Sequence, residues 1–386
     1  MVVEFLLGHQ DHAKAEDFLA GRPRGVGAVT LHTTYAQHQL AAAEAAVDAG
    51  VDVLYDPRTE RLAYPDPKGE TRKAPGWTGA PHDIGLLTQQ TDVRSRLVES
   101  VMAAHPPVAT IITPPSFFVA DVRAGHLNVA LAEETRILSA RPVRAKVLAS
   151  TRLAPSALSQ LAKEYADAGI REVDLRMSPL HGEDDGIRKI TQLFATADLF
   201  HELGIRVILG CSGNIGQVGF ALGHADGYSV GVGENEHVDH AAKISRQRAP
   251  QKLDPDGNAM KKGGGWEGIY LPGLALTVGR KQGETLLANT DIRTRIGCRI
   301  GACGRSISGP LQDYKTHYMH ARAESVAELD AQPEAWRGNT ELGRIERALE
   351  LRTLVNERYQ PSGQPRLRTR TLTNLVERIQ EEALAA

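Results

Sequence analysis

Residues 26–55 read VGAVTLHTTYAQHQLAAAEAAVDAGVDVLY, and this stretch decides the fold class. It begins with a short apolar run at residues 26–31 and continues with an Ala-rich segment at residues 37–49, which stops at Gly50. A second apolar run follows at residues 51–55. The order is typical of strand, helix and strand, with the glycine ending the helix. Two strands joined by a helix of this length predict a parallel βαβ unit.

The same alternation continues along the chain as far as residue 232. Strands alternating with helices throughout one unit predict a closed (β/α)8 TIM-like barrel of the α/β class, and a doubly wound open sheet is the alternative. Further strands are expected at residues 2–7, 108–112, 143–148, 172–176, 206–209 and 227–232. Further helices are expected at residues 92–104, 127–140, 156–168, 186–203 and 215–222.

Two long segments interrupt this rhythm. Residues 57–82 are rich in proline, glycine and charge and follow a predicted strand, so we expect them to lie over the carboxyl end of the barrel. Residues 249–268 contain three consecutive glycines and form a second such segment. Long loops without secondary structure of their own are uncommon and are often lids over a functional site.

The remainder of the chain has a different character. Residues 269–276 predict one more strand, and the sequence beyond residue 312 is mostly helical with a Pro/Gly break at residues 361–365. We therefore divide the chain into a barrel core and a second part that holds the basic lid loop, a cysteine-containing small subdomain and the C-terminal helices. The two parts are residues 1–239 and residues 240–386.

The composition excludes several classes of protein. Of the 386 residues, 41% are hydrophobic and 24% are charged, and the formal net charge is −2, so the chain is neither mainly disordered nor uniformly basic. Three cysteines are too few for a disulfide framework and indicate a reducing compartment. The sequence has no secretory signal and no run of 18 apolar residues. We expect a cytoplasmic protein that does not enter the membrane.

The active site of a (β/α)8 barrel lies at the carboxyl ends of its strands. Polar residues that directly follow the predicted strands are therefore candidates for the site. They are His32, Asp56, Ser150, Arg176, Ser178, Ser212, Gly213, Asn214, Glu234 and Asn235.

Two of these positions have alternative interpretations. Asp56 is either a catalytic or base-binding carboxylate or the first residue of an Asp-Pro turn. The run at residues 210–219 (GCSGNIGQVG) either exposes backbone N–H groups to an anion or is a compact turn. Its glycine spacing does not match GxGxxG, so we expect no nucleotide cofactor. Cys211 within the run is better explained as an inert buried thiol than as a nucleophile.

A candidate zinc site follows near the end of the second part. Cys298 and Cys303 are spaced C-x4-C, and His317 and His320 come shortly after them. Two thiolates and one or two imidazoles are suitable ligands for tetrahedral Zn²⁺, and the predicted set is Cys298, Cys303 and His317. Because this spacing is looser than C-x2-C, two free thiols beside a surface helix are the alternative.

Basic residues gather in one part of the chain. Residues 240–305 contain twelve lysines and arginines against five carboxylates. Such a local excess beside a lid loop suits the phosphate backbone of a nucleic acid. An exposed face balanced by acidic residues elsewhere in the fold is the alternative.

The order of these segments resembles the tRNA-guanine transglycosylase superfamily. The stretches that carry the resemblance are residues 51–64 (VDVLYDPRTERLAY), 146–183 (KVLASTRLAPSALSQLAKEYADAGIREVDLRMSPLHGE), 206–236 (RVILGCSGNIGQVGFALGHADGYSVGVGENE), 297–306 (GCRIGACGRS) and 316–329 (THYMHARAESVAEL). The resemblance implies a (β/α)8 barrel with a zinc-binding insertion that exchanges guanine for a 7-deazaguanine in tRNA or, in the related DNA-modifying branch, in DNA. In that family an aspartate on the last barrel strand attacks the ribose C1′.

Several family positions hold other residues in this chain. Ser229 stands at the place of the attacking aspartate, and Asp226 lies three residues earlier. Positions three apart point to opposite faces of a strand, so Asp226 replaces that aspartate only if the strand is bulged or shifted. Thr113 stands at the place of the base-reading aspartate, residues 149–150 at that of a glutamine, and Ile300 at that of the middle zinc cysteine.

Three hypotheses for function follow. The first is an enzyme of the pentosyltransferase type that exchanges or removes a purine or 7-deazapurine base in tRNA or DNA. The second is a non-catalytic paralogue that binds nucleic acid or serves as a partner in a homo- or heterodimer, and the third is an unrelated small-molecule barrel lyase or hydrolase. The catalytic candidates are Asp56, Asp226 and Ser229, and the binding candidates are His32, Ser150, Arg176, Ser212, Gly213, Asn214 and Glu234.

Overall fold

The structure, a computed structural model, describes residues 2–182, 185–250, 266–298, 303, 309–359 and 363–385. Seven strands in this part of the chain form one parallel sheet in the order β3-β2-β1-β7-β6-β5-β4. They are β1 (Val2–Leu6), β2 (Val26–His32), β3 (Asp52–Asp56), β4 (Ala145–Ser150), β5 (Glu172–Ser178), β6 (Arg206–Leu209) and β7 (Gly227–Gly231).

The chain between β3 and β4 closes this sheet into a barrel. On one side, the Thr110 N–H donates to the Val53 carbonyl of β3 at 2.9 Å. On the other side, the Ile112 N–H donates to the Pro142 carbonyl at 2.9 Å, and the Ile112 carbonyl accepts from the Arg144 N–H at 3.0 Å. The eighth position of the ring is therefore held by an irregular segment. The predicted (β/α)8 barrel is confirmed, and the open sheet is wrong.

The strand predicted at residues 108–112 forms only an isolated bridge, between Ile112 and Val143. Proline pairs at residues 106–107 and 114–115 flank it. Proline has no N–H to donate to a ladder, which keeps regular pairing from extending in either direction.

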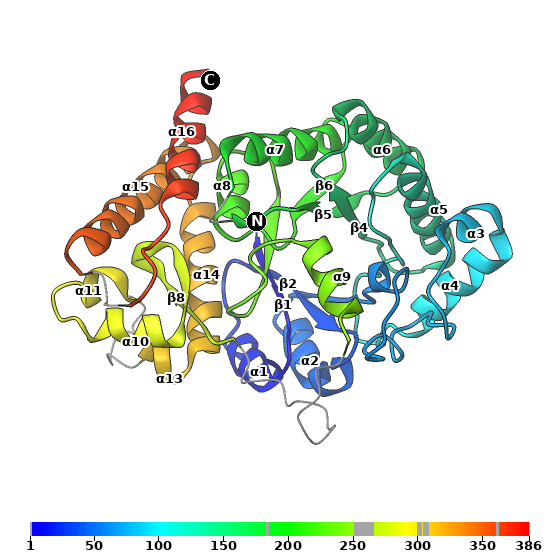
Figure 1. Cartoon of the computed structure of the whole chain (residues 1–386), viewed down its shortest axis with the longest axis horizontal. Helices are drawn as coiled ribbons and strands as arrows, with labels where there is room; N and C mark the ends of the chain where they lie inside the picture. Colours follow the sequence, from blue (N-terminus) through cyan, green and yellow to red (C-terminus); the bar gives the residue numbers. More distant parts are fainter. Residues whose placement is uncertain are drawn as a thin grey trace.

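Helices surround the strands (Figure 1). The predicted barrel helices are confirmed within a few residues, and Gly50 ends the second of them at a positive φ of 74°. The helices of the barrel are α1 (His12–Ala20), α2 (Leu40–Asp48), α3 (Ile84–Gln89), α4 (Thr91–Ala103), α5 (Val122–Leu138), α6 (Pro155–Asp167), α7 (Ile187–His201) and α8 (Gly213–Ala221). Short 3-10 turns lie at Ala36–Gln39 and Thr59–Arg61.

Beyond β7 the chain leaves the barrel and returns to it. Helix α9 (His240–Arg248) comes first, and a hairpin of β8 (Gly268–Leu271) and β9 (Leu276–Gly279) occupies the place of the single strand predicted at residues 269–276. The later helices are α10 (Arg280–Ala288), α11 (Arg293–Ile296), α13 (Gly309–Gln312), α14 (Tyr314–Asp330), α15 (Glu334–Arg358) and α16 (Arg370–Ala385). Helix α14 packs on β1 and α1, so it takes the position of the last barrel helix.

The main apolar core lies between the strands and this ring of helices. Its members run from Val3 in β1 to Ile379 in α16, so the C-terminal helices share one core with the barrel. A second, smaller core lies under the hairpin and includes Ile269 and Leu287. The division of the chain at residue 240 stays a prediction. Among the described helices, none is both long enough and apolar enough to cross a membrane.

Candidate active site at the barrel mouth

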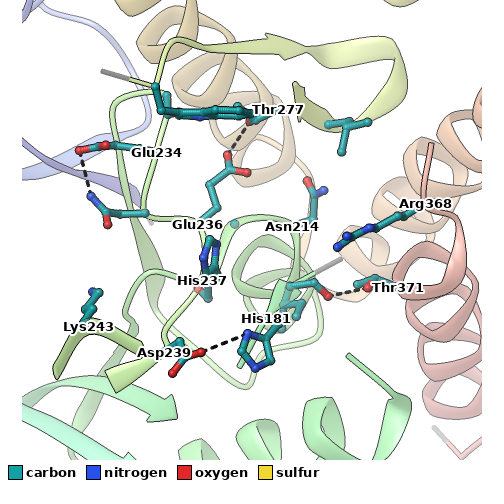
Figure 2. Close-up of a pocket in the computed structure, with 18 of the residues that line it drawn as sticks. His181, Asn214, Glu234, Glu236, His237, Asp239, Lys243, Thr277, Arg368 and Thr371 are labelled. Atoms are coloured by element: carbon teal, nitrogen blue, oxygen red, sulfur yellow. Dashed lines mark hydrogen bonds and ion pairs between the residues drawn. The ribbon is translucent and has the colours of Figure 1, made fainter. Parts of the chain in front are cut away.

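Two adjoining cavities open at the carboxyl ends of the strands, with volumes of about 1110 Å³ and about 490 Å³. The smaller one is drawn in Figure 2. Both are lined by Glu234, Asn235, Lys243 and Arg246, which form a shared wall. The larger cavity also has His32, Asp56 and Arg176 in its lining, and the smaller one has Ser212, Gly213 and Asn214. Most of the predicted candidates thus meet at one end of the barrel, in two cavities.

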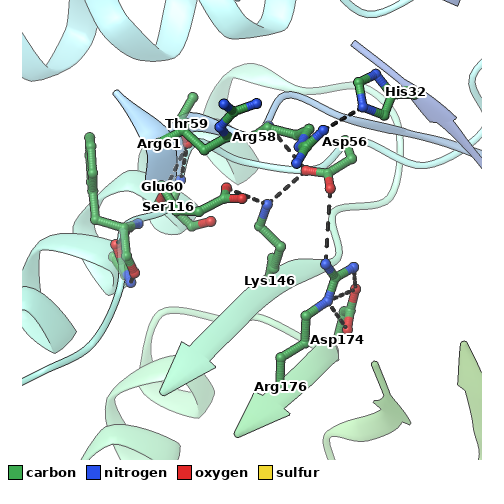
Figure 3. A network of polar contacts seen from close by, with 12 residues as sticks. His32, Asp56, Arg58, Thr59, Glu60, Arg61, Ser116, Lys146, Asp174 and Arg176 are labelled. Atoms are coloured by element: carbon green, nitrogen blue, oxygen red, sulfur yellow. Dashed lines mark hydrogen bonds and ion pairs between the residues drawn. The ribbon is translucent and has the colours of Figure 1, made fainter. Parts of the chain in front are cut away.

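A network of charges forms the floor of the larger cavity (Figure 3). Lys146 of β4 donates from Nζ to Asp56 Oδ1 at 2.7 Å and to Glu60 Oε2 at 2.8 Å. Its side chain is 2% exposed, whereas that of Asp56 keeps 16%. Burial alone would raise the pKa of Asp56, but the charges of Lys146 and Arg176 outweigh it and hold this pKa well below its usual range. Asp56 is therefore a carboxylate that remains ionised and reaches solvent.

Arg176 joins this network from the neighbouring strand, β5. Its guanidinium donates from Nε to Asp174 Oδ1 at 3.0 Å and lies 4.0 Å from Asp56 Oδ2. Oδ2 is thus the less engaged oxygen of Asp56, because Oδ1 also accepts the Arg58 N–H at 3.0 Å.

The alternation of residues along β4 and β5 explains why charge lies inside the barrel. Charged and apolar residues alternate along residues 172–177 of β5, whereas Lys146 is the only charged residue of β4, and successive side chains of a strand point to opposite faces. A parallel barrel strand is buried on both faces, and its outer face packs on the helices. The polar positions of β4 and β5 therefore lie on the inner face and point into the ring. Sequence reasoning identified Arg176 but missed Lys146 and Asp174, which this alternation could have indicated.

Further polar residues lie around the rim. The Arg58 guanidinium contacts Nε2 of His32. Burial, and next the charge of Arg58, lower the pKa of His32 to about 4, so this ring is neutral at pH 7. Glu234 is exposed at the rim, where partial burial and then the negative charge of Asp11 raise its pKa. Asp56 and Glu234 therefore differ in the direction of their pKa shifts within one cavity.

Lys243 projects from α9 into the wall between the cavities. Burial is the largest cause that lowers its pKa, and the nearby cations Arg58 and Arg176 add to the effect. Within the described residues no carboxylate lies at ion-pair distance from its Nζ. The orientation of α9 is set by Asp239, whose Oδ1 accepts the Ala242 N–H at 2.9 Å as the N-cap.

Four predicted residues line neither cavity. One is Ser178, which is buried at the end of β5 and accepts the His240 N–H on its Oγ at 2.9 Å. Asp226 precedes β7 and so lies at the amino end of the barrel, where its Oδ2 accepts the Val207 N–H at 2.9 Å and contacts His201. This placement does not fit the predicted catalytic role. That role required a bulge or shift of the strand, whereas β7 runs from Gly227 to Gly231, as predicted for its start. Ser229 is buried inside the barrel and accepts the Cys211 N–H on its Oγ. Ser150 accepts the Arg152 N–H at 3.1 Å and lines neither cavity.

The Gly-rich turn after β6 is fixed in place by one local and one long-range hydrogen bond. Ser212 Oγ donates to the Leu209 carbonyl at 2.8 Å, and Asn214 Nδ2 donates to the Ala275 carbonyl at 2.6 Å. Cys211 is 2% exposed and packs in an apolar cluster, as its interpretation as an inert thiol requires. The run forms a compact turn that also lines the smaller cavity, and binding of an anion by its backbone N–H groups stays a prediction.

The predicted zinc ligands lie close to one another. Ligand atoms of Cys298, Cys303 and His317 all fall within 4.8 Å of one another. His317 is fully buried, and its Nε2–H donates to the Tyr270 carbonyl at 2.6 Å. Its Nδ1 has no hydrogen-bond partner within the described part of the chain. A metal-ligating histidine is usually held in this way, with one ring nitrogen on a carbonyl and the other free for the ion. The three side chains fit a zinc ion.

Comparisons with known proteins show no matching family model and no matching curated protein. Solved structures that are similar include the KD(P)GA of T. tenax, at a TM-score of 0.31 and 15% identity over 100% of this chain and 99% of that one. The 3-dehydroquinate dehydratase of Aquifex aeolicus VF5 has a TM-score of 0.35 and 9% identity, over 64% of this chain and 97% of that one. The 4-hydroxy-tetrahydrodipicolinate synthase of Methylacidiphilum fumariolicum SolV has a TM-score of 0.32 and 8% identity, over 100% of this chain and 97% of that one. Similarity at this level carries no argument about the reaction.

Proposed function

We propose that the protein is an enzyme that breaks the glycosidic bond of a nucleoside-type substrate in the larger cavity and releases or exchanges its base. One observation carries this proposal: Asp56 and Glu234 line that cavity, and their pKa values are shifted in opposite directions. Glycosidic chemistry uses one ionised carboxylate and one carboxylic acid in this way.

The two groups have separate roles in the proposed reaction. Positive charge develops on the sugar as the bond from C1′ to the base nitrogen lengthens, and the Asp56 carboxylate stabilises that charge electrostatically. Glu234 donates its proton to the departing nitrogen, while the electron pair of the broken bond stays with the base. A water molecule or an incoming base then attacks C1′ and returns a proton to Glu234. Lys146 supports the reaction by keeping Asp56 ionised.

The charges at the rim support a phosphate-bearing substrate. Arg58, Lys68 and Arg246 line the larger cavity, and within the described residues none of them has a carboxylate at ion-pair distance. Uncompensated cations around a cavity attract phosphate groups. A nucleotide, tRNA or DNA is therefore the proposed substrate, with a purine or 7-deazapurine base as the sequence resemblance implies.

The test is release or exchange of a base. The purified protein would be incubated with nucleotides, tRNA and duplex DNA, with and without labelled guanine, and bases would be quantified by chromatography and mass spectrometry. Asp56→Asn should lower the rate by at least about a hundredfold, because it removes the ionised carboxylate. Asp226→Asn is the matched control, since that carboxylate lies at the opposite end of the barrel.

Each outcome of this test is informative. Activity that is lost in Asp56→Asn and kept in Asp226→Asn supports the proposal. Activity lost equally in both variants would contradict the assigned role of Asp56. If no base is released from or inserted into any of these substrates, the enzymatic proposal is rejected, and nucleic-acid binding in a gel-shift assay would then favour the non-catalytic paralogue.

Lys243 favours a second candidate function, a lyase that forms an imine with a carbonyl substrate. Its pKa is lowered, and an amine of this kind at a barrel mouth can attack a carbonyl and release water. Lys146 is excluded from this role because Asp56 and Glu60 raise its pKa and keep it protonated. Borohydride reduction with 2-oxo acids and aldose phosphates should add mass to the peptide that carries Lys243. No such adduct with any of them would reject this candidate.

We also propose that Cys298, Cys303 and His317 hold a structural Zn²⁺ ion. The support is the orphaned Nδ1 of His317 beside two thiols. The ion would supply no step of the reaction, because it would join α14 to the segment before it. The described residues provide three of the four ligands of a tetrahedral site.

A further inference from the structure

The smaller cavity lies beside the proposed reaction centre and has features of its own. Its volume of about 490 Å³ is within the range of small-molecule sites. Figure 2 shows Glu234, His237 and Lys243 on one side and Arg368 and Thr371 of the C-terminal segment on the other. The two cavities share four lining residues, so a ligand in one lies next to a ligand in the other.

Trp266 provides an aromatic surface in the lining of this cavity. Its side chain is 60% exposed, and its Nε1–H donates to the Gly233 carbonyl at 3.1 Å, which fixes the orientation of the ring. The ring lies against Gly279, where a Cβ atom would be only 3.0 Å from it. One part of the indole is thus seated on the β9 backbone while most of its surface is open. A fixed, exposed indole is a stacking surface for a planar heterocycle.

Three carboxylates line the smaller cavity, and each has a contact within the protein. Glu234, in the shared wall, accepts a hydrogen bond from Asn235 Nδ2 at 3.1 Å. Glu236 forms an ion pair with Arg322 and accepts a hydrogen bond from Thr277 at 3.0 Å. Asp239 caps α9 and lies 3.8 Å from His181.

The cations of the shared wall are not engaged in this way. Lys243 and Arg246 have no carboxylate at ion-pair distance within the described residues. At the shared wall these two cations stand beside one carboxylate, Glu234, so the wall keeps an excess of positive charge that would attract an anionic group.

We propose that the smaller cavity binds one nucleotide of the substrate, with its base stacked on Trp266 and its phosphate held by Lys243 and Arg246. This inference rests on the proposed function, because it makes the cavity a recognition site for the unit next to the reacting one. The phosphate lies at the shared wall, which is where a chain would pass from one cavity to the other. The same chemistry suits a free nucleotide or one within a nucleic acid.

Fluorescence of Trp266 tests the proposal directly. The chain has three tryptophans, so Trp77→Phe combined with Trp336→Phe leaves Trp266 as the only one. This protein would be titrated with AMP, adenosine, ribose 5-phosphate, inorganic phosphate and a single-stranded hexanucleotide of deoxyadenosine, and chromatography would verify that each probe stays intact. We expect saturable quenching by AMP, with adenosine and ribose 5-phosphate each bound at least about tenfold more weakly.

Variants of the native chain separate the two contacts by calorimetry. Trp266→Ala should weaken AMP binding by about 5- to 100-fold, the range of base stacking on an aromatic ring, and Trp266→Phe should restore most of it. Arg246→Met should weaken AMP but leave adenosine unchanged, because it removes only a phosphate contact. Trp336→Ala is the matched control, since Trp336 is 65% exposed on α15 and does not line this cavity.

The outcomes decide the proposal and the source of the ligand. Binding of AMP that depends on Trp266 and Arg246 supports a nucleotide subsite, and the same dependence with the hexanucleotide alone supports a site for a nucleic-acid chain. Three outcomes would overturn the nucleotide subsite. They are no saturable quenching by either AMP or the hexanucleotide, binding of inorganic phosphate as tight as that of AMP, and an equal loss of AMP binding in Trp336→Ala. Binding without base release in the earlier assay would reject only the glycosidic function. Base release without these effects would reject only the subsite.

Discussion

Lys146 lies at the centre of the charged cluster at the barrel mouth. It lies inside the ring with 2% of its side chain exposed and contacts both Asp56 and Glu60. A buried ammonium is costly unless it is paired, and the same holds for the two carboxylates that it contacts. Each group therefore keeps the others ionised, and the state of Asp56 that the proposed reaction needs is a property of the whole cluster.

Replacing this lysine should destabilise the fold. Lys146→Met leaves two largely buried carboxylates without their common cation, and we expect a loss of about 3–5 kcal/mol in the free energy of unfolding. Lys163→Met is the control, because Lys163 is exposed on α6, and its effect should stay within about 0.5 kcal/mol. Urea denaturation measures both. A loss below about 1 kcal/mol for Lys146→Met would show that the cluster does not need its lysine.

His105 predicts a dependence of stability on pH. Its Nδ1–H donates to the Val101 carbonyl at 2.8 Å, and its Nε2 accepts the Thr113 N–H at 3.1 Å, so the buried ring is neutral. Burial lowers the pKa of His105 to about 4, below the value of about 6.5 in an unfolded chain. Its contribution is therefore complete above pH 6.5 and is lost as the pH falls through 4, by roughly 3 kcal/mol for the full shift.

A non-titrating variant isolates that contribution. The free energy of unfolding of the native protein should fall between pH 7 and pH 4.5 more steeply than that of His105→Gln, as measured by urea denaturation at each pH. Parallel curves for the two proteins would mean that His105 is not the group responsible.

At the scale of elements, residues next to a strand limit how far its pairing extends. The run at residues 108–112 has the composition of a strand, yet proline pairs on both sides limit its pairing. The hairpin of β8 and β9 was predicted as one strand, because the turn at Pro272–Leu274 is short and apolar. Hydrophobic patterning indicates how much chain lies in a strand but is a weaker guide to where the ladder stops.

His317 lies on α14 and donates to the Tyr270 carbonyl of β8, so removal of a metal ion from this place should affect how these elements are held together. If His317 joins Cys298 and Cys303 in holding Zn²⁺, the purified protein should contain about one equivalent, and chelation should lower the melting temperature, because bound metal stabilises only the folded state. Cys298→Ser should reduce the metal content, whereas Cys211→Ser should not, since Cys211 lies in a separate cluster. Elemental mass spectrometry checks this. Less than about a tenth of an equivalent in native protein would contradict a structural zinc site.

At the scale of the whole molecule, the barrel is completed by chain from both ends. β1 pairs with β2 and β7, and α14 packs on β1 and α1, far from them in sequence. Leu372, Leu375 and Ile379 of α16 are also buried in the main core. The predicted division at residue 240 can therefore be tested by cutting the chain there.

A fragment of residues 1–239 should fail to fold cooperatively. It lacks α14, so the packing surface of Phe5 and Phe18 would lose cover on one side, and apolar area of this kind supplies most of the stability of a domain. Near-ultraviolet circular dichroism and thermal denaturation would check the prediction against the full chain. A sharp unfolding transition in the fragment would instead establish residues 1–239 as an independent domain.

Periodicity and glycine stops are local signals, and they were enough to predict the (β/α)8 barrel, most helix ends and the position of Asp56 at a strand's carboxyl end. The folded chain was needed to show that Asp56 meets Lys146, that Asp226 lies at the far end, and that His317 approaches two cysteines. These depend on which side chains face each other across the ring. Strand spacing specifies the face of a side chain but not its partner across the barrel, since that partner comes from a distant part of the chain.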